Sequence, residues 1–144
     1  MGAKLLGRTY RLVRTRSLYL LDTTVLIDVA RRKEPATSWL GDTLRRSDQV
    51  CVSAVTVAEF FAGVRPAQRI EWQRFIDGLT HWDVTREIAI RAGTLRYDLA
   101  RQGRAILILD ALIAATAIAY GASLATANIK DFSVPGLATL RLGR

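Results

Sequence analysis

Four acidic side chains in this chain of 144 residues stand where an α/β fold would bring carboxylates together. Asp22 directly follows an apolar run, and Glu59 lies about one and a half helical turns after a second apolar run. Asp110 precedes an alanine-rich apolar segment, and Asp131 follows a short strand candidate. Open parallel sheets bind ligands outside the carboxyl ends of their strands, so we expect these acids to meet there.

Carboxylates that converge need a positive charge between them, because like charges at short range cannot all ionise without compensation. Mg²⁺ and Mn²⁺ are hard cations that prefer oxygen ligands, keep several waters and act on phosphate groups in hydrolysis and phosphoryl transfer. The acids therefore predict a divalent metal site that works on a phosphate compound.

Each acid also has a simpler explanation. Asp22 can open a turn, and Asp110 stands where an N-cap is expected before the next helix. Asp131, next to Lys130, fits a solvated loop charge. Glu59 is harder to explain in this way, because its neighbours are nearly all apolar and a buried Glu needs a partner. The joint placement of the acids, rather than any one of them, favours the metal site.

Composition argues against other common catalytic arrangements. With one His and one Cys, the chain supplies neither a zinc set nor an intramolecular disulfide. We expect His81 to be structural and Cys51, inside an apolar run, to be an inert core residue. The lone cysteine and the lack of an apolar stretch of signal-peptide length favour a reducing cytoplasm and no membrane segment.

The elements that must position the acids alternate between short apolar strands and amphipathic helices, which is typical of a mostly parallel sheet with helices on both faces. Thr23 or Thr24 is expected to cap the first helix, and Thr85 a later one. The longest apolar stretch, residues 105–127, is expected to be buried core. We expect strands near residues 18–21, 50–52, 81–84, 123–126 and 137–142, and helices near residues 25–32, 39–44, 53–61, 67–79, 86–101 and 111–120.

The positive charge is concentrated at one end of the chain. There are 21 Lys and Arg against 13 Asp and Glu, a formal net charge of +8 that favours anionic partners. Five of the basic residues and no acid fall within residues 1–18, so the remainder carries only +3. We therefore separate a basic N-terminal tail, residues 1–17, from one folded domain, residues 18–144. The tail is expected to be disordered or to contact the anionic partner.

Four motifs together resemble those of the PIN domain family, and more narrowly those of VapC-type toxins of prokaryotic toxin–antitoxin pairs. They stand in the family's order and spacing over about residues 18–142: LLDTTVLI at 20–27, SAVTVAEFFAG at 53–63, DALIAATA at 110–117, and LATAN with the following DF at 124–132. The family usually has Asn at the position of Thr24, and many members have Asp at the position of Asn128.

The resemblance implies a three-layer α/β/α fold around a mostly parallel sheet of four to five short strands. It also implies an endoribonuclease that depends on Mg²⁺ or Mn²⁺ and hydrolyses RNA phosphodiester bonds. The acids that match the family's metal ligands are Asp22, Glu59 and Asp110; to them we add Asp131 as a fourth acid, and Thr23, Thr126 and Asn128 as groups that orient carboxylates or contact the substrate.

Family members are usually dimeric and are held inactive by a cognate antitoxin. The resemblance thus implies a homodimeric toxin that inhibits translation and growth, with an antitoxin segment seated in an apolar groove lined by the early helices. Candidate groove residues are Trp39, Trp72 and Phe75. Candidate phosphate contacts are Arg31, Arg32, Arg65, Arg69, Arg101 and Arg104.

Two alternative functions remain open from the residues alone. A haloacid-dehalogenase-like phosphatase also ends a strand on an Asp, but it needs a second Asp at the position that Thr24 occupies. A non-catalytic nucleic-acid-binding module would use the basic charge alone. Neither alternative explains Glu59 in its apolar setting as well as a metal site does.

Overall fold

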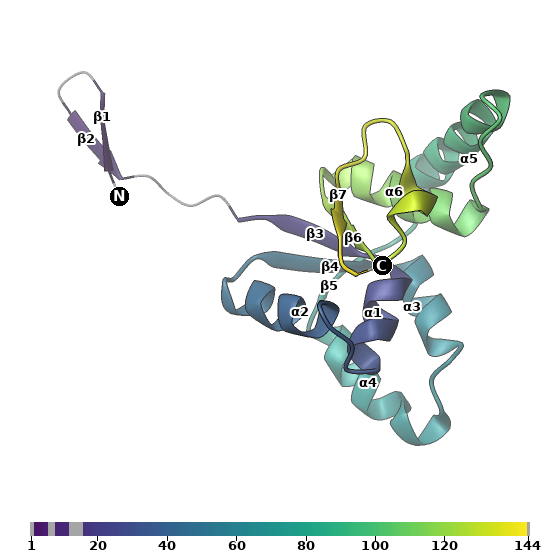
Figure 1. The fold of residues 1–144 in the computed structure, drawn as a ribbon, viewed down its shortest axis with the longest axis horizontal. Coiled ribbons are helices and arrows are strands. Elements are labelled where there is room, and N and C mark those ends of the chain that lie inside the picture. Colours follow the sequence, from purple (N-terminus) through teal and green to yellow (C-terminus); the bar gives the residue numbers. More distant parts are fainter. Residues whose placement is uncertain (1, 6–7, 12–15, 144) are drawn as a thin grey trace.

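The computed structural model describes residues 2–5, 8–11 and 16–143, which form two separate β-sheets (Figure 1). A small antiparallel sheet pairs β1 (Gly2–Leu5) with β2 (Arg8–Arg11). The predicted basic tail, residues 1–17, falls in part on residues outside the described ones. Its boundary at residue 18 and its role therefore stay predictions.

The central sheet has five strands, all parallel, in the order β5–β4–β3–β6–β7. From β3 the chain first adds strands on one side and then crosses back to add β6 and β7 on the other, so the strand order reverses between β3 and β6. Open α/β sheets bind ligands at such a reversal. The predicted sheet is confirmed, and its strands are β3 (Leu18–Leu21), β4 (Gln49–Ser53), β5 (Thr80–Trp82), β6 (Ser123–Thr126) and β7 (Thr139–Arg141).

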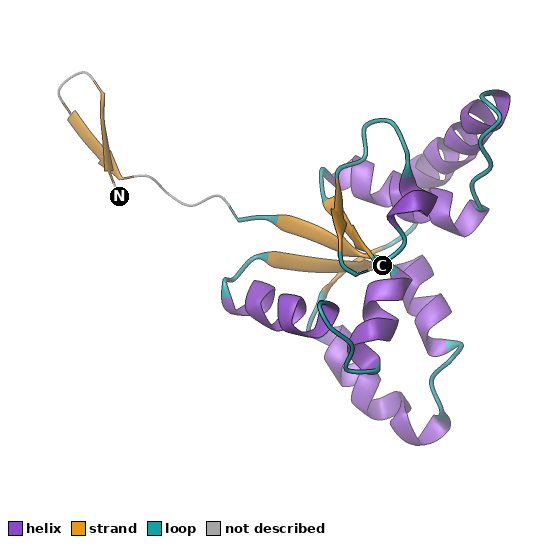
Figure 2. Ribbon diagram, in the orientation of Figure 1, coloured by secondary structure: helices purple, strands orange, loops and turns teal. Residues whose placement is uncertain are grey.

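Six helices cover the two faces of this sheet and complete a three-layer α/β/α domain (Figure 2). Helices α1 to α4 lie on one face, and α5 and α6 lie on the other. None of the helices within the described residues is long and apolar enough to cross a bilayer. The elements are α1 (Thr23–Ala30), α2 (Ala36–Arg45), α3 (Ala54–Phe61), α4 (Arg69–Asp77), α5 (Arg86–Arg101) and α6 (Ile108–Tyr120), with short 3₁₀ turns η1 (Pro66–Gln68) and η2 (Ile129–Phe132).

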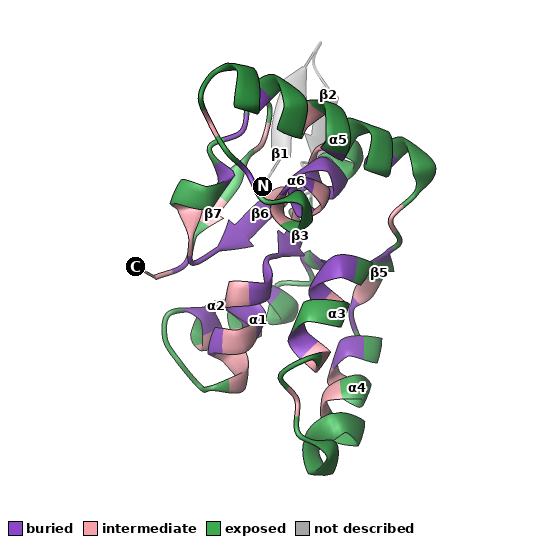
Figure 3. Ribbon diagram, turned by 90° about the vertical axis from the view of Figure 1, so that its right-hand side faces the viewer, coloured by how far each residue is buried: buried purple, intermediate pink, exposed green. Residues whose placement is uncertain are grey.

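The three central strands β3, β4 and β6 are largely buried and separate two apolar cores, whereas the edge strands β5 and β7 are partly exposed (Figure 3). Successive side chains of a strand point to opposite faces, so Leu20 and Leu124 pack toward α5 and α6. Their neighbours Leu21 and Ala125 pack toward α1 to α4. This burial on both faces explains why the strands read as continuous apolar runs rather than as alternating patterns.

Local capping accounts for where the helices begin. Ser53 Oγ accepts the Thr56 amide at 3.1 Å at the start of α3, and Thr85 accepts the Ile88 amide at 3.2 Å at the start of α5, as predicted. The prediction that Thr23 or Thr24 caps the first helix is wrong, because α1 already begins at Thr23 and Asp22 is its N-cap.

The start of α6 differs from the prediction in two ways. The helix begins at Ile108 with Leu107 as its N-cap, so Asp110 lies in the first turn and is not the N-cap. Residues 107–109 are not buried core either, since Leu107 is 71% exposed, although Ile106 before them is buried. The alanine-rich part of α6 packs on the sheet, whereas the chain that enters the helix runs along the surface. An apolar run by itself does not distinguish these two parts.

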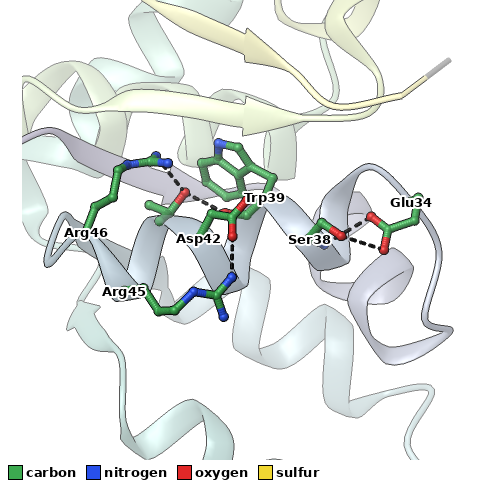
Figure 4. A network of polar contacts seen from close by, with 7 residues as sticks. Glu34, Ser38, Trp39, Asp42, Arg45 and Arg46 are labelled. Atoms are coloured by element: carbon green, nitrogen blue, oxygen red, sulfur yellow. Dashed lines mark hydrogen bonds and ion pairs between the residues drawn. The ribbon is translucent and has the colours of Figure 1, made fainter.

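Polar contacts fix α2 along its length (Figure 4). Glu34 accepts hydrogen bonds from the amide and the hydroxyl of Ser38 at 3.1 and 2.8 Å. The Thr43 hydroxyl donates to the Trp39 carbonyl at 2.6 Å and accepts from Arg46 at 3.2 Å. Asp42 and Arg45 form an ion pair on the outer face of the helix.

Cys51 and His81 have structural environments, as expected. Burial raises the pKa of the Cys51 thiol to about 11, so the thiol stays protonated and unreactive at neutral pH. His81 lies on the edge strand β5 with its Nε2 atom 2.9 Å from the Ile76 carbonyl.

Candidate active site

The carboxylate of Asp22 lies at the point where the strand order reverses. Leu21 of β3 pairs with Ala125 of β6, and the Asp22 amide donates to the Ala125 carbonyl at 2.9 Å. Asp22 is 4% exposed and stands before α1, yet its side chain makes no capping hydrogen bond to that helix. The carboxylate is therefore free of the role that Asp usually has at this position.

Two threonine hydroxyls hold one oxygen of this carboxylate. Thr24 donates to Asp22 Oδ2 at 2.7 Å, and Thr126 donates to the same atom at 2.8 Å. Each hydroxyl also accepts a backbone amide, Thr24 from Ala127 at 3.1 Å and Thr126 from Asn128 at 2.9 Å. These amides fix the direction in which the hydroxyls donate. No group within the described residues bonds Asp22 Oδ1, so this second oxygen is available to a ligand.

Glu59 reaches the same edge of the sheet from α3, but not in the way its sequence context suggests. The residue is exposed, so the expectation of a Glu buried among apolar neighbours is wrong. Its neighbours Val55 and Phe60 turn into the two cores, while Glu59 points away from them. Its Oε1 atom accepts a hydrogen bond from the Thr23 hydroxyl at 2.8 Å, which ties α3 to the start of α1.

Thr56, which is not among the predicted site residues, supports this contact from the buried side. Its fully buried hydroxyl lies 3.4 Å from the Thr23 hydroxyl and 3.4 Å from the Leu21 carbonyl. Thr56 precedes Glu59 by three residues and therefore lies on the same face of α3. That spacing is the sequence signal by which Thr56 can be found.

Electrostatic repulsion links Asp110 to the other three acids. Burial, followed by the negative charges of Asp22, Asp131 and Glu59, raises the pKa of Asp110 from its ordinary 3.8 to about 6. The position of Asp110 in the first turn of α6 opposes this effect, since a helix N-terminus favours negative charge. The other three predicted acids thus each lie close enough to Asp110 for their charges to act on it.

The donor set fits a hard divalent cation in its chemistry. All four groups are carboxylates, the ligands that Mg²⁺ and Mn²⁺ prefer, and a cation would relieve their mutual repulsion. No three of the described His, Cys, Asp and Glu side chains lie close enough together to hold one ion between them. Mg²⁺ commonly binds one or two carboxylates directly and keeps several waters. The arrangement therefore suits direct ligation by one or two acids and contact with the others through water.

Asn128 and Asp131 lie at the two ends of the 3₁₀ turn that follows β6. Asn128 is the N-cap of η2 and is half-buried, and Asp131 is exposed. The Asp131 amide donates to the Asn128 carbonyl at 3.0 Å, which closes the turn. The charge of Asp131 reaches Asp110, and the Asn128 backbone amide bonds the Thr126 hydroxyl that holds Asp22.

A cavity of about 630 Å³ opens beside Glu59 between α1, α3 and α4. Its walls combine apolar side chains such as Phe60 and Trp72 with charged ones of both signs. Of the predicted groove residues only Trp72 lines it. Trp39 instead packs edge-on against Tyr19 with ring centroids 5.1 Å apart.

The predicted phosphate-contacting arginines divide between two cavities. Three of them line the cavity beside Glu59, and Arg104 lines a smaller one beside Asp131. Two lie along neither cavity, namely Arg69 and Arg101. The three beside Glu59 are Arg31, Arg32 and Arg65.

Comparisons with known proteins agree on one family. The PIN domain family model matches residues 19–135. Ribonuclease VapC19 of Mycobacterium tuberculosis is 32% identical over 113 residues, which cover 78% of this chain and 90% of that protein. The tRNA(fMet)-specific endonuclease VapC of Shigella flexneri is 31% identical over 127 residues, which cover 84% of this chain and 95% of that protein.

Solved structures show the same similarity. VapBC2 from Rickettsia felis, bound to a DNA fragment from its promoter, superposes with a TM-score of 0.75 at 26% identity, covering 85% of this chain and 97% of that one. DNA-bound VapBC from Salmonella typhimurium superposes with a TM-score of 0.74 at 26% identity, covering 87% of this chain and 98% of that one. The three-layer fold expected from the motifs is therefore confirmed.

The raised pKa of Asp110 predicts a pH-dependent stability in the absence of metal. An acid with a folded-state pKa above its unfolded value costs stability once the pH rises through that window, here from about 4 to about 6. Asp110→Asn removes this cost. In EDTA we expect the variant to gain about 1–2 kcal/mol of unfolding free energy at pH 7.5 and little at pH 4.5, measured by urea denaturation.

Asp98→Asn is the matched control, because it removes the same charge from the exposed part of α5. It should change stability little at either pH. A gain in Asp110→Asn that is equal at both pH values, or a loss at pH 7.5, would show that the acids do not repel one another at this edge.

Proposed function

The chain belongs to the PIN domain family, and from this premise we propose that it is a metal-dependent endoribonuclease, the toxin of a type II toxin–antitoxin pair. It hydrolyses RNA phosphodiester bonds and inhibits translation and growth until a cognate antitoxin neutralises it. The ribonuclease names of its relatives and the VapBC structures support this proposal. The comparisons support neither a phosphatase nor a non-catalytic binding module.

One observation carries the proposal. Burial, followed by the negative charges of Asp22, Asp131 and Glu59, raises the pKa of Asp110 at the edge where the strand order reverses. A stable domain has no structural need to gather three carboxylates around a half-buried fourth one, because their repulsion costs stability. A bound metal ion, which compensates the negative charges and acts on a phosphate substrate, accounts for that arrangement.

Some residues of the chain bind the metal ion in this proposal, and others orient those metal-binding residues. When bound, Mg²⁺ or Mn²⁺ supplies Lewis-acid polarisation of a phosphoryl oxygen and lowers the pKa of the attacking water. Asp22, Asp110 and Glu59 are the proposed metal-binding acids, one or two of them directly and the rest through water, with Oδ1 as the free oxygen of Asp22. Thr24 and Thr126 keep Asp22 in one orientation through Oδ2.

The remaining predicted residues surround these ligands. Thr23 orients Glu59 through the hydrogen bond at 2.8 Å. Asn128 presents an amide that can bond water or substrate beside Thr126, and Asp131 adds a fourth negative charge at the rim. In this proposal their roles are orientation and substrate contact rather than direct metal ligation.

The test is RNA cleavage by the purified, antitoxin-free protein with and without Mg²⁺ or Mn²⁺. We expect cleavage with metal and none in EDTA, and we expect Asp22→Asn and Asp110→Asn to abolish it. Thr126→Val keeps the shape of the side chain but loses the hydroxyl that holds Asp22, so it should lower activity by about 10- to 100-fold. Thr116→Val is its matched control, since Thr116 is equally buried but bonds only the Leu112 carbonyl within α6.

Full cleavage by Asp22→Asn, or cleavage in EDTA, would reject the proposed metal site. Expression in a bacterial host separates a toxin from a general RNA-processing nuclease. A toxin arrests growth, and the product of a neighbouring small gene relieves the arrest, whereas a processing enzyme does neither.

The cavity beside Glu59 is the proposed seat of the antitoxin. Its apolar wall, with Phe60 and Trp72, suits the apolar side of a helix or extended segment. Its charged residues suit the polar side of such a segment, and Glu59 places the end of the cavity next to the proposed metal ligands. An antitoxin seated there would block the site. Because its proposed substrate is RNA and its proposed partner is an antitoxin, we propose that the protein acts in the cytoplasm.

A second copy of the chain is the proposed partner of an exposed apolar surface around the start of α6. Large apolar side chains of α5 and of the α6 entry are uncovered here, namely Ile90, Tyr97, Leu107 and Ile108. A cavity of about 440 Å³ lies among them, lined in part by Tyr97 and Ile108. Protruding side chains next to a receiving cavity can serve both halves of a two-fold interface, and exposed apolar patches of this kind mark association surfaces.

Light scattering after size-exclusion chromatography tests this association. We expect the wild-type protein to have twice the mass of one chain, 16.0 kDa. Leu107→Lys buries a charge in the interface and should shift the protein to monomer. Ile70→Lys is the control, because Ile70 is 67% exposed on α4 and lies outside this surface. A monomeric wild type, or a dimer that Leu107→Lys leaves intact, would contradict the proposal.

A further inference from the structure

Arg104 lies between two cavities on the side of the site that faces away from the proposed antitoxin seat. One cavity, of about 320 Å³, is lined by Arg104, Lys130, Asp131 and Ser133, among others. The second, of about 470 Å³, shares Arg104 and Ser133 and continues along the chain that follows η2. Arg104 is half-buried, and no described residue forms a hydrogen bond or ion pair with its guanidinium group. A guanidinium in such a position is prepared for a ligand rather than for a structural partner.

The backbone that carries Arg104 is fixed on both sides. Gly103 adopts the left-handed conformation with φ of 74° and ends α5. The Gly103 amide bonds the Ala100 carbonyl at 3.0 Å, and the Arg104 amide bonds the Leu99 carbonyl at 2.9 Å. These two bonds form a Schellman motif, which sets the direction of the chain after the helix. The Ile106 carbonyl, two residues after Arg104, accepts a hydrogen bond from Arg96 Nε at 3.1 Å, which ties the loop to α5.

The charges around this cavity differ from those at the neighbouring metal site. Arg104 and Lys130 contribute two positive charges against one negative charge from Asp131, and none of them forms an ion pair within the described residues. The same Asp131 acts on the pKa of Asp110, so the cavity adjoins the acid cluster. A phosphate chain that approaches the four acids meets positive charge on this side, as it also does at the three arginines beside Glu59.

We infer that Arg104, with Lys130 and Ser133, forms a phosphate-binding subsite that holds a backbone phosphate of the RNA next to the one that is cut. This inference rests on the proposed ribonuclease function and adds to it a defined direction for the substrate strand. Arg104 supplies a planar fork of donors that matches two phosphate oxygens, and Lys130 adds a point charge. The Ser133 hydroxyl adds a neutral donor. Contacts of this kind position the substrate without reading its sequence.

Binding of a single-stranded RNA tests the subsite apart from chemistry. The probe is a fluorescein-labelled 12-nucleotide RNA of mixed sequence, titrated with the full-length, antitoxin-free protein in EDTA at several salt concentrations. Arg104→Gln should weaken binding several-fold and reduce the slope of log Kd against log salt by about 0.7, the value for one lost phosphate contact on a single strand. Cleavage with metal should show a raised KM and a kcat within about twofold of wild type, because the subsite positions RNA and takes no part in the reaction.

Arg45→Gln is the matched control (Figure 4). Arg45 ends α2 just before β4 begins, so it lies at the opposite edge of the sheet from the acids. This substitution removes the same charge and should leave the affinity and the salt slope unchanged. Thermal denaturation of both variants checks the fold, which Arg104→Gln should preserve because the side chain makes no internal bond.

The outcomes separate the subsite from the function on which it rests. If wild-type protein binds and cleaves RNA but Arg104→Gln matches it in affinity, salt slope and KM, the subsite is wrong and the ribonuclease function stands. The subsite is also wrong if Arg45→Gln shows an equal loss, because the effect is then one of net charge. If wild-type protein neither binds nor cleaves RNA, the proposed function falls, and the subsite falls with it.

Discussion

Repulsion among four carboxylates is the constraint on which the rest of the structure depends. Burial, followed by the negative charges of Asp22, Asp131 and Glu59, raises the pKa of the half-buried Asp110 to about 6. A fold that brings these groups together must either hold them in place against their repulsion through rigid hydrogen bonds or neutralise the repulsion with a cation. The structure contains the supports, and the family to which the chain belongs suggests the cation.

The supports come from the topology of the sheet. The reversal of strand order between β3 and β6 places Asp22 and Thr126 side by side, although they are far apart in sequence. Three threonine hydroxyls from α1 and β6 then hold Asp22 and Glu59, and each of these hydroxyls is itself in contact with a second polar group. The network leaves Oδ1 of Asp22 without an internal partner. Rigidity on one oxygen and availability of the other are what a metal ligand requires.

The sequence alone predicts the sheet, the order of elements and the identity of the converging acids, because apolar runs and capping residues mark strand and helix ends locally. It does not predict the exposure of Glu59, since the apolar neighbours that suggested burial point into the cores on either side of it. It also misplaces the start of α6 and the exposure of Leu107, because an apolar run looks the same whether it packs on the sheet or lies at the surface. The spacing before Glu59 marks Thr56 as a candidate, but the contacts that Thr56 makes are tertiary, and no local pattern contains them. The position of Arg104 between two cavities is likewise a tertiary feature.

The most direct test of the metal site is an anomalous difference map from crystals of the antitoxin-free protein soaked in Mn²⁺. We predict one strong peak at the carboxyl ends of β3 and β6, in contact with Asp22 and Asp110, and its loss in crystals of Asp22→Asn. A peak elsewhere, or a peak at this place that persists in Asp22→Asn, would contradict the claim that these carboxylates are gathered to hold a cation.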